Sequence, residues 1–427
     1  MKKPILALIS GMIVLFLFIG FNSCKKENEN NTKINYDYVV LAWNNLGMHC
    51  LNPTYDQLVI LPPYNTVWAQ VVRRGNPPTV LTDGIKVKYS IVDNTYSYGK
   101  DAYGGFWDNS QQLFGTTVQH DKGLTGSGLS GEMVVSGNHF EIVGIPIVPV
   151  NDQGVWDPYQ VMNVTVEDQN GNVLVSTQAT VPTSDEINCA KCHGDNAFAD
   201  ILSKHDAANG TNLVGNQPVL CASCHPDPAL GTTGTGQMYL SEAVHGFHAD
   251  KDAACYDCHP GTQTQCSRSL KHTATDGNCT TCHGQMSDIA NSIAQGRIPW
   301  GGEPKCVTCH TGVDGVDTGD QLYRDSEGHG NLGCPACHGS PHAMYPSRET
   351  ADNHQPLQYQ DFANSVKTIG SCGCCHDNSR GGGDIGEFSG AHGGSKPESQ
   401  NACHVCHTVV PTDTSKWPHS YTWKNSN

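Results

Sequence analysis

The amino-acid sequence predicts a mixed fold, in which an all-β domain is followed by a domain of short helices and coil. The cysteines divide the chain: of 20 cysteines in 427 residues, only Cys24 and Cys50 precede Asp185. Strand-like runs fill the part before this point, whereas short repeated motifs in Gly-, Asp-, Thr- and Asn-rich surroundings fill the part after it. We therefore expect four segments, residues 1–24, 25–35, 36–182 and 183–427.

The first segment has the features of an export signal peptide. Lys2 and Lys3 precede an apolar run that is too short for a comfortable membrane span. The residues before Cys24 resemble a bacterial lipobox, although they depart from its usual small-residue pattern. They predict a lipid anchor at Cys24, with an ordinary cleaved signal or an uncleaved anchor as alternatives. Residues 25–35 are polar and suit a flexible tether. We expect an outer membrane lipoprotein or a cell-surface protein, with the periplasm as the alternative location.

Residues 36–182 contain six runs with the composition of β-strands. In the clearest run, 85–92, apolar and polar residues alternate as a half-buried strand requires. The other runs rich in β-branched or aromatic residues are 38–43, 66–72, 140–143, 159–167 and 172–181. Asn170-Gly171 between the last two runs predicts a tight hairpin with a primed turn. Short strands separated by Gly, Pro and Asn predict an all-β sandwich of immunoglobulin-like type.

Residues 94–131 are rich in glycine and aromatic residues. We interpret them as a long connection held by buried aromatic side chains rather than as a functional loop. His49, His120 and His139 of this half are interpreted as structural hydrogen-bonding residues. His49 differs from the other two, because it lies between a methionine and a cysteine.

The pattern Cys-x-x-Cys-His occurs eight times in the second half and is the attachment signature of c-type haem. Two thiols three positions apart can add to the two vinyl groups on one edge of a porphyrin. The histidine that follows then lies under the macrocycle, where its neutral imidazole ligates iron. The predicted attachment cysteines are Cys189, Cys192, Cys221, Cys224, Cys255, Cys258, Cys279, Cys282, Cys306, Cys309, Cys334, Cys337, Cys372, Cys375, Cys403 and Cys406. The predicted motif ligands are His193, His225, His259, His283, His310, His338, His376 and His407.

Zinc binding and disulfide bonding account for the cysteines less well than haem does. Zinc sites also use paired cysteines, but they do not require a histidine after every second cysteine. A disulfide scaffold leaves the eight motif histidines unexplained. The sequence therefore predicts eight covalently attached haem c groups, each with an iron atom.

The haems themselves are expected to form the hydrophobic core of the second half. Successive motifs begin only 24 to 38 residues apart, which leaves little protein around each haem. Such a chain folds around its cofactors, as small metal-dependent domains do. Short helices are predicted at 199–209, 240–247, 287–295 and 358–368, with coil elsewhere.

The second axial ligand decides what each haem does. An iron with two histidines can only pass electrons, whereas an iron with an open position can bind and transform a substrate. Ten further histidines follow Cys189, and eight would saturate every iron. The predicted second ligands are His205, His245, His248, His272, His329, His342, His392 and His419. His404 lies inside its own motif and is poorly placed to reach that haem, though it could reach another. His354 lies in a Gln/Asn-rich loop, and an axial ligand and a surface residue are equally open interpretations of it. Met286 and Met344 are weaker alternatives as axial ligands.

Charge and the remaining cysteines add two expectations. The formal net charge of −16, with no Lys/Arg cluster, excludes a nucleic-acid partner. It favours basic patches on partner proteins, or metal cations. Cys50 and Cys266 belong to no motif, and a disulfide between them is an open alternative to two thiols.

The second half resembles the octahaem members of the multihaem c-type cytochromes. Trp43-Asn-Asn-Leu-Gly-Met-His-Cys50 and Cys337-His-Gly-Ser-Pro-His342 are similar to motifs of exported multihaem cytochromes in bacteria that respire on extracellular or insoluble acceptors. The resemblance implies electron transfer across or beyond the outer membrane. It also implies redox partner proteins of the envelope, an extracellular metal or mineral acceptor, and self-assembly into filaments, since related cytochromes polymerise.

Three function classes follow from the sequence. The leading hypothesis is an electron relay through eight haems in the cell envelope, with no catalytic residue. The second is an octahaem redox enzyme of the tetrathionate, nitrite or hydroxylamine type with one open haem. We favour the relay because histidines are in excess and the Cys-x-x-Cys-Lys motif common at nitrite-reducing haems is absent. The third class is binding to a partner or polysaccharide through the β domain.

Overall fold

The computed structural model describes residues 37–75, 78–236, 238–270, 272, 279–306, 321–345, 347–354, 375, 407–409 and 422–423. All of these belong to one compact unit, 36–427. The predicted signal peptide, lipid anchor and tether lie outside the described residues, as does the helix predicted at 358–368. Within the described residues, no helix combines the length and the apolar character that crossing a bilayer requires.

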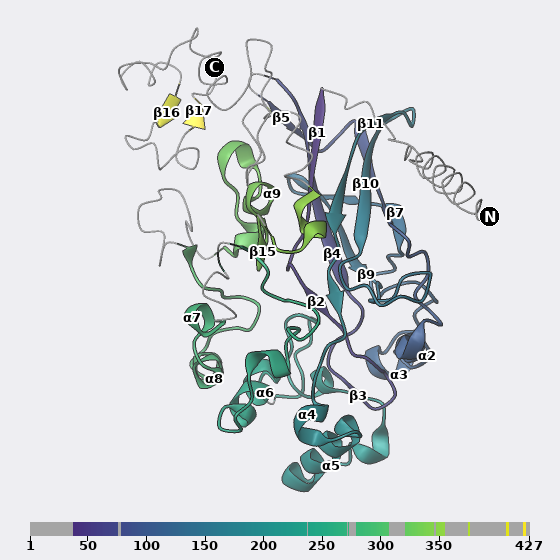
Figure 1. Cartoon of the computed structure of the whole chain (residues 1–427), viewed down its shortest axis with the longest axis vertical. Helices are drawn as coiled ribbons and strands as arrows, with labels where there is room; N and C mark the ends of the chain where they lie inside the picture. Colours follow the sequence, from purple (N-terminus) through teal and green to yellow (C-terminus); the bar gives the residue numbers. More distant parts are fainter. Residues whose placement is uncertain are drawn as a thin grey trace, which may run out of the picture. The chain divides into compact units, whose positions relative to one another are not determined.

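Two antiparallel sheets dominate residues 37–182 (Figure 1). The first sheet has the order β1 (Tyr38–Asn44), β4 (Asn65–Arg73), β9 (His139–Ile145) and β8 (Val134–Ser136), with β5 (Thr79–Leu81) also paired to β4. The second sheet has the order β11 (Val173–Thr180), β10 (Val161–Asp168), β6 (Ile85–Ile91) and β7 (Ser130–Glu132). The six strand runs expected from the sequence all appear, so the prediction of a β-rich first half is confirmed.

Both sheets contribute to one apolar core. Val67 of β4, Val87 of β6 and Val164 of β10 are fully buried in the same cluster. Along β6 the buried Val87 and Tyr89 alternate with the exposed lysines Lys86 and Lys88, because successive side chains of a strand point to opposite faces. The alternation in the sequence therefore identified which side of this strand faces the core.

The hairpin between β10 and β11 has a different turn from the one expected. Both primed turns need a positive φ at the first central residue, but among residues 169–172 only Gly171, the second residue of the expected pair, has one, at 84°. The Gly171 N–H donates to the Asp168 carbonyl oxygen at 3.1 Å. The Asp168 carboxylate accepts from the N–H groups of Asn170 and Asn172 at 2.8 and 2.9 Å. The predicted primed turn is wrong because Asp168 stabilises this different loop conformation.

Residues 94–131 form a second, smaller core. They contain η1 (Asp101–Gly104), α2 (Gly105–Asp108) and α3 (Ser110–Phe114). Tyr103, Phe106 and Trp107 are buried together, and Tyr96 is exposed. The interpretation as a connection held by buried aromatic side chains is confirmed for these three residues.

Two short parallel pairs join the chain on either side of residue 182. β2 (His49–Cys50) pairs with β12 (Thr183–Ser184), and β3 (Leu58–Val59) pairs with β13 (Val219–Leu220). The buried Asn65 amide donates to the Pro182 carbonyl oxygen at 3.1 Å. The β-rich region and the start of the motif region are therefore held in a fixed register.

The helices after residue 185 are short. They are α4 (Ala190–His193), α5 (Ala197–Asn209), α6 (Leu240–His248), α7 (Cys279–His283), α8 (Met286–Ala294) and α9 (Cys334–His338), with the 3-10 turns η2 (Val214–Asn216), η3 (Cys221–Ser223), η4 (Cys255–Asp257), η6 (Tyr323–Asp325), η7 (His329–Asn331) and η8 (Thr350–Asn353). The predicted helices at 199–209, 240–247 and 287–295 are confirmed by α5, α6 and α8. Helix α5 ends where Gly210 takes a left-handed φ of 66° and its N–H donates to the Asp206 carbonyl oxygen. The expectation of coil elsewhere is wrong at the attachment motifs, because several of them form a helical turn.

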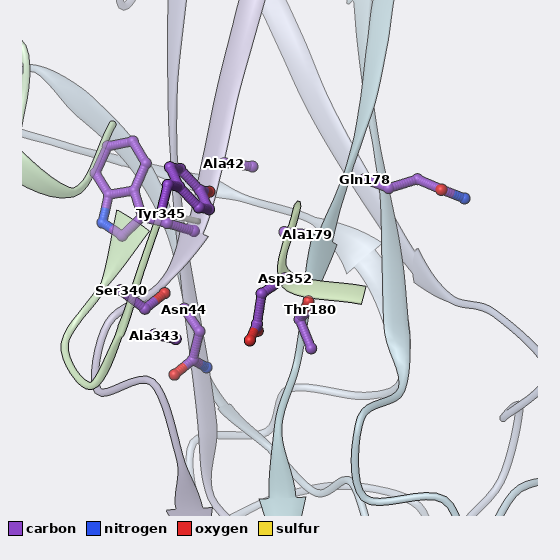
Figure 2. Close-up of a pocket in the computed structure, with 10 residues that line it drawn as sticks. Ala42, Asn44, Gln178, Ala179, Thr180, Ser340, Ala343, Tyr345 and Asp352 are labelled. Carbon is purple, nitrogen blue, oxygen red and sulfur yellow. The ribbon is translucent and has the colours of Figure 1, made fainter. Parts of the chain in front are cut away.

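The segment after α9 lies where the edges of the two sheets meet. It contains the hairpin of β14 (Gly339–Ser340) and β15 (Ala343–Met344). The edge strands β1 and β11 contact each other, and Figure 2 shows the small pocket at this seam. Its lining includes Ala42, Asn44, Gln178, Ala179, Thr180, Ser340, Ala343, Tyr345 and Asp352. The segment thus covers sheet edges that would otherwise expose unpaired backbone groups. A last pair, β16 (His407–Val409) with β17 (Thr422–Trp423), lies near the C-terminus of the chain.

Candidate functional site

The first three attachment motifs each form one helical turn. The His193 N–H donates to the Cys189 carbonyl oxygen at 2.9 Å, and the same bond closes the second motif at 3.0 Å and the third at 2.9 Å. Residues i, i+3 and i+4 of a helical turn share one face. Both thiols and the histidine of a motif therefore point to the same side, as attachment to one edge of a macrocycle requires.

Four motif histidines each face a second histidine. The facing pairs and their ring-centroid separations are His193–His248 at 6.5 Å, His205–His225 at 6.4 Å, His245–His259 at 6.2 Å and His283–His342 at 5.9 Å. Each pair joins a motif histidine to one of the histidines that the sequence nominated as a second ligand. The sequence could nominate these residues but could not assign which one belongs to which motif.

The separation suits a metal ion between the two rings. A histidine nitrogen lies about 2.0 Å from a bound metal ion and about 1 Å from its own ring centroid, so two axial imidazoles place their centroids about 6 Å apart. Stacked rings lie much closer, as Tyr98 and His120 do at 3.4 Å, whereas rings in edge-to-face contact, such as Tyr98 and Trp107, lie 5.8 Å apart. The four separations therefore match those of two ligands of one metal ion, and they also match edge-to-face contact.

Nδ1 of four paired histidines makes a hydrogen bond that leaves the lone pair on Nε2. Nδ1 of His193 donates to the Asp200 carboxylate at 2.7 Å. Nδ1 of His225, His245 and His248 donates to the carbonyl oxygens of Met238, Ser241 and Val244 at 2.9, 2.7 and 2.8 Å. Because these partners can only accept, the proton is on Nδ1 and the lone pair is on Nε2. Such hydrogen bonds fix the ring and make Nε2 more basic towards a metal.

In His205, a hydroxyl group places the proton on Nδ1 in the same way. Its Nδ1 lies 3.0 Å from the Thr211 oxygen, and the Thr211 hydroxyl donates its only proton to Asp206 at 2.6 Å. The hydroxyl oxygen must therefore accept from His205. Nε2 of His205 is left with the lone pair that an iron needs.

Burial keeps several of these imidazoles neutral. It lowers the pKa of His245, His259 and His283, because the charged form loses its hydration. Arg297 lowers the pKa of His245 and His283 further, because its positive charge disfavours a second one nearby. A neutral imidazole is the form that ligates a metal.

His342 is held in a conformation that few histidines adopt. Its φ of 61° lies in the left-handed region, which is uncommon for residues other than glycine. The backbone N–H groups of Arg268 and Ser269 donate to its carbonyl oxygen at 2.8 and 3.1 Å. Arg268 is itself fixed by a buried ion pair with Asp352. No sequence pattern indicates this support, because 74 residues separate Arg268 from His342.

The sixth and seventh motifs contact the β-rich region. Ala336 of α9 packs with Leu41 and Trp43 of β1, and Cys375 packs against the same cluster. The Gln70 side chain accepts from the Gly333 N–H at 2.9 Å, directly before the sixth motif. The Gly75 N–H donates to the Cys375 carbonyl oxygen at 3.3 Å. The first sheet therefore supports two attachment motifs on the face opposite its core.

Several predicted site residues lie outside the part of the chain that the structure describes. They are Cys309, His310, Cys372, His376, His392, Cys403, Cys406 and His419, together with the side chains of His329 and His407. His272 is exposed, and His338 of the sixth motif is half-buried. His354, for which the sequence left an axial ligand and a surface residue equally open, is half-buried, with its Nε2 shielded from solvent.

The histidines of the first half are placed as structural residues. Nε2 of His49 lies 3.0 Å from the Asn45 side-chain oxygen. The hydrogen bonds of the paired histidines involve Nδ1 instead. His139 packs on Trp68 at 4.5 Å between ring centroids, and His120 stacks on Tyr98. His49, which the sequence set apart from the other two histidines, therefore makes a structural hydrogen bond to Asn45.

Cys50 and Cys266 are thiols in this structure rather than a disulfide. Burial raises the pKa of Cys266 to about 11 and that of Cys50 still higher, and the proximity of Cys266 adds to the shift at Cys50. Both thiols are therefore protonated and unreactive at neutral pH.

Within the described residues, no group of three or more His, Cys, Asp or Glu side chains is arranged to hold a metal ion. Comparisons of the chain with protein-family models, with curated proteins and with solved structures found no match. The function is therefore argued from the motifs and from the paired histidines.

Proposed function

We propose that this protein is an octahaem c-type cytochrome that relays electrons through eight covalently bound haems in the cell envelope. The observation that carries the proposal is the set of four motif histidines that each face a second histidine across 5.9 to 6.5 Å. A bound haem supplies an iron that cycles between the ferric and ferrous states, and two axial imidazoles leave it no position for a substrate.

Three features of this chain fit the attachment of haem c. The motif turns present two thiols and a histidine on one face, and Cys192 and Cys224 are exposed where a macrocycle would cover them. The Nδ1 hydrogen bonds of His193 and His245 hold these two rings in one orientation. A ligand that does not reorient on electron transfer keeps the reorganisation small, which favours a relay.

We further propose that the two sheets form a sandwich of immunoglobulin-like type and that the haems form the core of the motif region. The shared apolar core of the two sheets supports the first part. Among the described residues after 185, the short helices and the small number of buried apolar side chains support the second.

The location and partners rest on the sequence. The signal-like N-terminus and Cys24 support an exported lipoprotein of the outer membrane or cell surface. The net charge of −16 supports basic redox partners of the envelope, or a metal or mineral acceptor. Self-assembly into filaments is proposed only from the resemblance to exported cytochromes.

Low-temperature EPR with optical spectra on the purified holoprotein tests the relay against the enzyme alternative. The haem content should be eight per chain, with every haem low-spin and unchanged by cyanide. A high-spin haem that binds cyanide in the unsubstituted protein would overturn the relay and point to tetrathionate, nitrite or hydroxylamine chemistry.

Two variants test the ligand pairs directly. His205→Ala should make one haem high-spin and open to cyanide, because it removes the ring opposite His225. His120→Ala is the matched control: the same substitution at a ring that stacks on Tyr98 should leave all haems low-spin. Equal spectra for the two variants would contradict the assignment of His205.

A further inference from the structure

One helix carries the partners of two different motifs. His245 and His248 of α6 are three residues apart, and they face His259 of the third motif and His193 of the first. Residues three apart on a helix are surface neighbours, with Cβ atoms about 5–6 Å from each other. Building on the proposed function, we infer that α6 ligates two adjacent haems, and that the first four haems form a row in the order second, first, third, fourth.

Direct contacts join the first and third motifs. Lys191 lies between the two cysteines of the first motif and Asp257 between those of the third, and their side chains form an ion pair at 2.6 Å. The Asn188 N–H donates to the Asp257 carbonyl oxygen at 3.2 Å. The two attachment turns therefore touch, although 66 residues separate them in the chain.

Helix α5 joins the second motif to the first. Asp200, in its first turn, accepts the Nδ1 proton of His193 from the first motif. His205, further along the same helix, faces His225 of the second motif. The second haem therefore lies beside the first, on the side away from α6.

Helices α6 and α8 join the third motif to the fourth. A Cβ atom added at Gly246 of α6 would lie 3.6 Å from Cβ of Ala290 in α8, so the two helices pack closely. Helix α8 follows directly on the turn of the fourth motif, α7. The thiols of Cys255 and Cys279, the first cysteines of these two motifs, are also in hydrogen-bonding contact. In Figure 1, α6 lies between the pair α4 and α5 and the pair α7 and α8.

The row gives α6 a specific role. In this row, the two haems that α6 would hold through His248 and His245 lie between the second and the fourth. The Nδ1 protons of both ligands are donated to carbonyl oxygens one turn earlier in the same helix, of Ser241 and Val244. The helix backbone itself therefore fixes the relative orientation of the two central ligands.

Distances between pairs of opened haems test this order. His245→Ala/His248→Ala opens the third and first haems of the holoprotein, and His205→Ala/His342→Ala opens the second and fourth. Nitric oxide added to the dithionite-reduced proteins gives one unpaired electron at each opened haem, whereas the remaining ferrous bis-histidine haems are diamagnetic. The magnetic dipolar coupling between the two spins falls with the cube of their separation and is read by pulsed EPR.

We expect the coupling to be several-fold stronger in His245→Ala/His248→Ala than in His205→Ala/His342→Ala. Equal couplings, or a stronger one in the second protein, would overturn the order. Failure of nitric oxide to bind either single variant of a pair would instead overturn the ligand assignments of the proposed function. Iron positions in an experimental density map of the unsubstituted holoprotein give a second measurement that needs no variant. In that map, a fourth iron closer to the second than to the third would also overturn the order.

Discussion

Arg268 and Asp352 form an ion pair in which both side chains are almost fully buried, at 1% and 5% exposure. Two bonds join them, from Nε of Arg268 at 2.5 Å and from the Nη2 atom at 2.9 Å. The backbone N–H of the same arginine holds the carbonyl oxygen of His342 in its left-handed conformation. The ion pair therefore supports a proposed haem ligand without touching its ring.

Asp352→Asn should destabilise the protein and disturb the fourth haem. Removing one partner leaves the guanidinium buried without its counter-charge, which costs about 3–5 kcal/mol in the free energy of unfolding. We expect this loss in denaturant unfolding of the holoprotein, together with a high-spin fraction in EPR as His342 loses its position.

Asp325→Asn is the control for this change. Asp325 forms a long ion pair with Arg324, 3.7 Å between nitrogen and oxygen, in which it is 43% exposed. Such a pair contributes about 0–1 kcal/mol. An unfolding free energy lowered equally by the two substitutions would show that burial of the Arg268 pair does not matter.

Gly47→Ala should be strongly destabilising for a steric reason. Gly47 has a φ of 78°, and a Cβ atom there would lie 1.7 Å from the carbonyl oxygen of Pro341. The backbone of β14–β15 would have to move away from the end of β1. Because the conformational strain alone costs about 1–2 kcal/mol, we expect a total loss well above that value in denaturant unfolding.

Gly99→Ala separates the backbone strain of a left-handed φ from the steric clash with Pro341. Gly99 also has a left-handed φ, of 83°, but nothing lies within 4 Å of an added Cβ atom. This variant should therefore lose only the strain, about 1–2 kcal/mol. Similar losses for the two variants would contradict the close approach of Gly47 to Pro341.

The sequence predicted the strands better than the site geometry, for a physical reason. The alternation in 85–92 is local, and burial of Val87 and Tyr89 follows from it directly. The turn at Asn170-Gly171 was predicted wrongly because a carboxylate two residues earlier, Asp168, stabilises another loop.

The number of histidines in the sequence predicts His245 and His248 as second ligands, but it does not predict which motif histidine each of them faces. His245 faces a histidine 14 residues away and His342 one 59 residues away, so tertiary packing alone decides the partners.

His49 should make stability depend on pH. Burial lowers its pKa from 6.5 to about 4, because the protonated ring would lose its hydration. Between these values the unfolded state binds the proton and the folded state does not, so the contribution of His49 is fully present above pH 6.5 and is lost as pH falls towards 4. The largest loss is about 3 kcal/mol, since one pKa unit corresponds to about 1.4 kcal/mol.

Unfolding in urea at pH 7 and pH 4.5, followed by far-UV circular dichroism, measures this effect. His49→Gln keeps an N–H donor for Asn45 but cannot titrate, so its stability should fall less between the two pH values. His120→Ala serves as the control, because the exposed His120 lies outside this hydrogen bond. An unchanged pH dependence in His49→Gln would show that other groups produce it.

Asp200 should set the reduction potential of the first haem through the ring of His193. The carboxylate accepts the Nδ1 proton at 2.7 Å, which makes the opposite nitrogen more basic; at the proposed haem this would stabilise ferric iron relative to ferrous. Asp200→Asn weakens this bond and removes the charge, so the potential of one haem should rise in spectroelectrochemical titration while the haem count stays at eight. Asp250→Asn makes the same change of charge at a residue that is 76% exposed and paired with Lys251. Because this second carboxylate makes no bond to a ligand ring, a rise of equal size in both variants would mean that surface charge, and not the bond to His193, controls the potential.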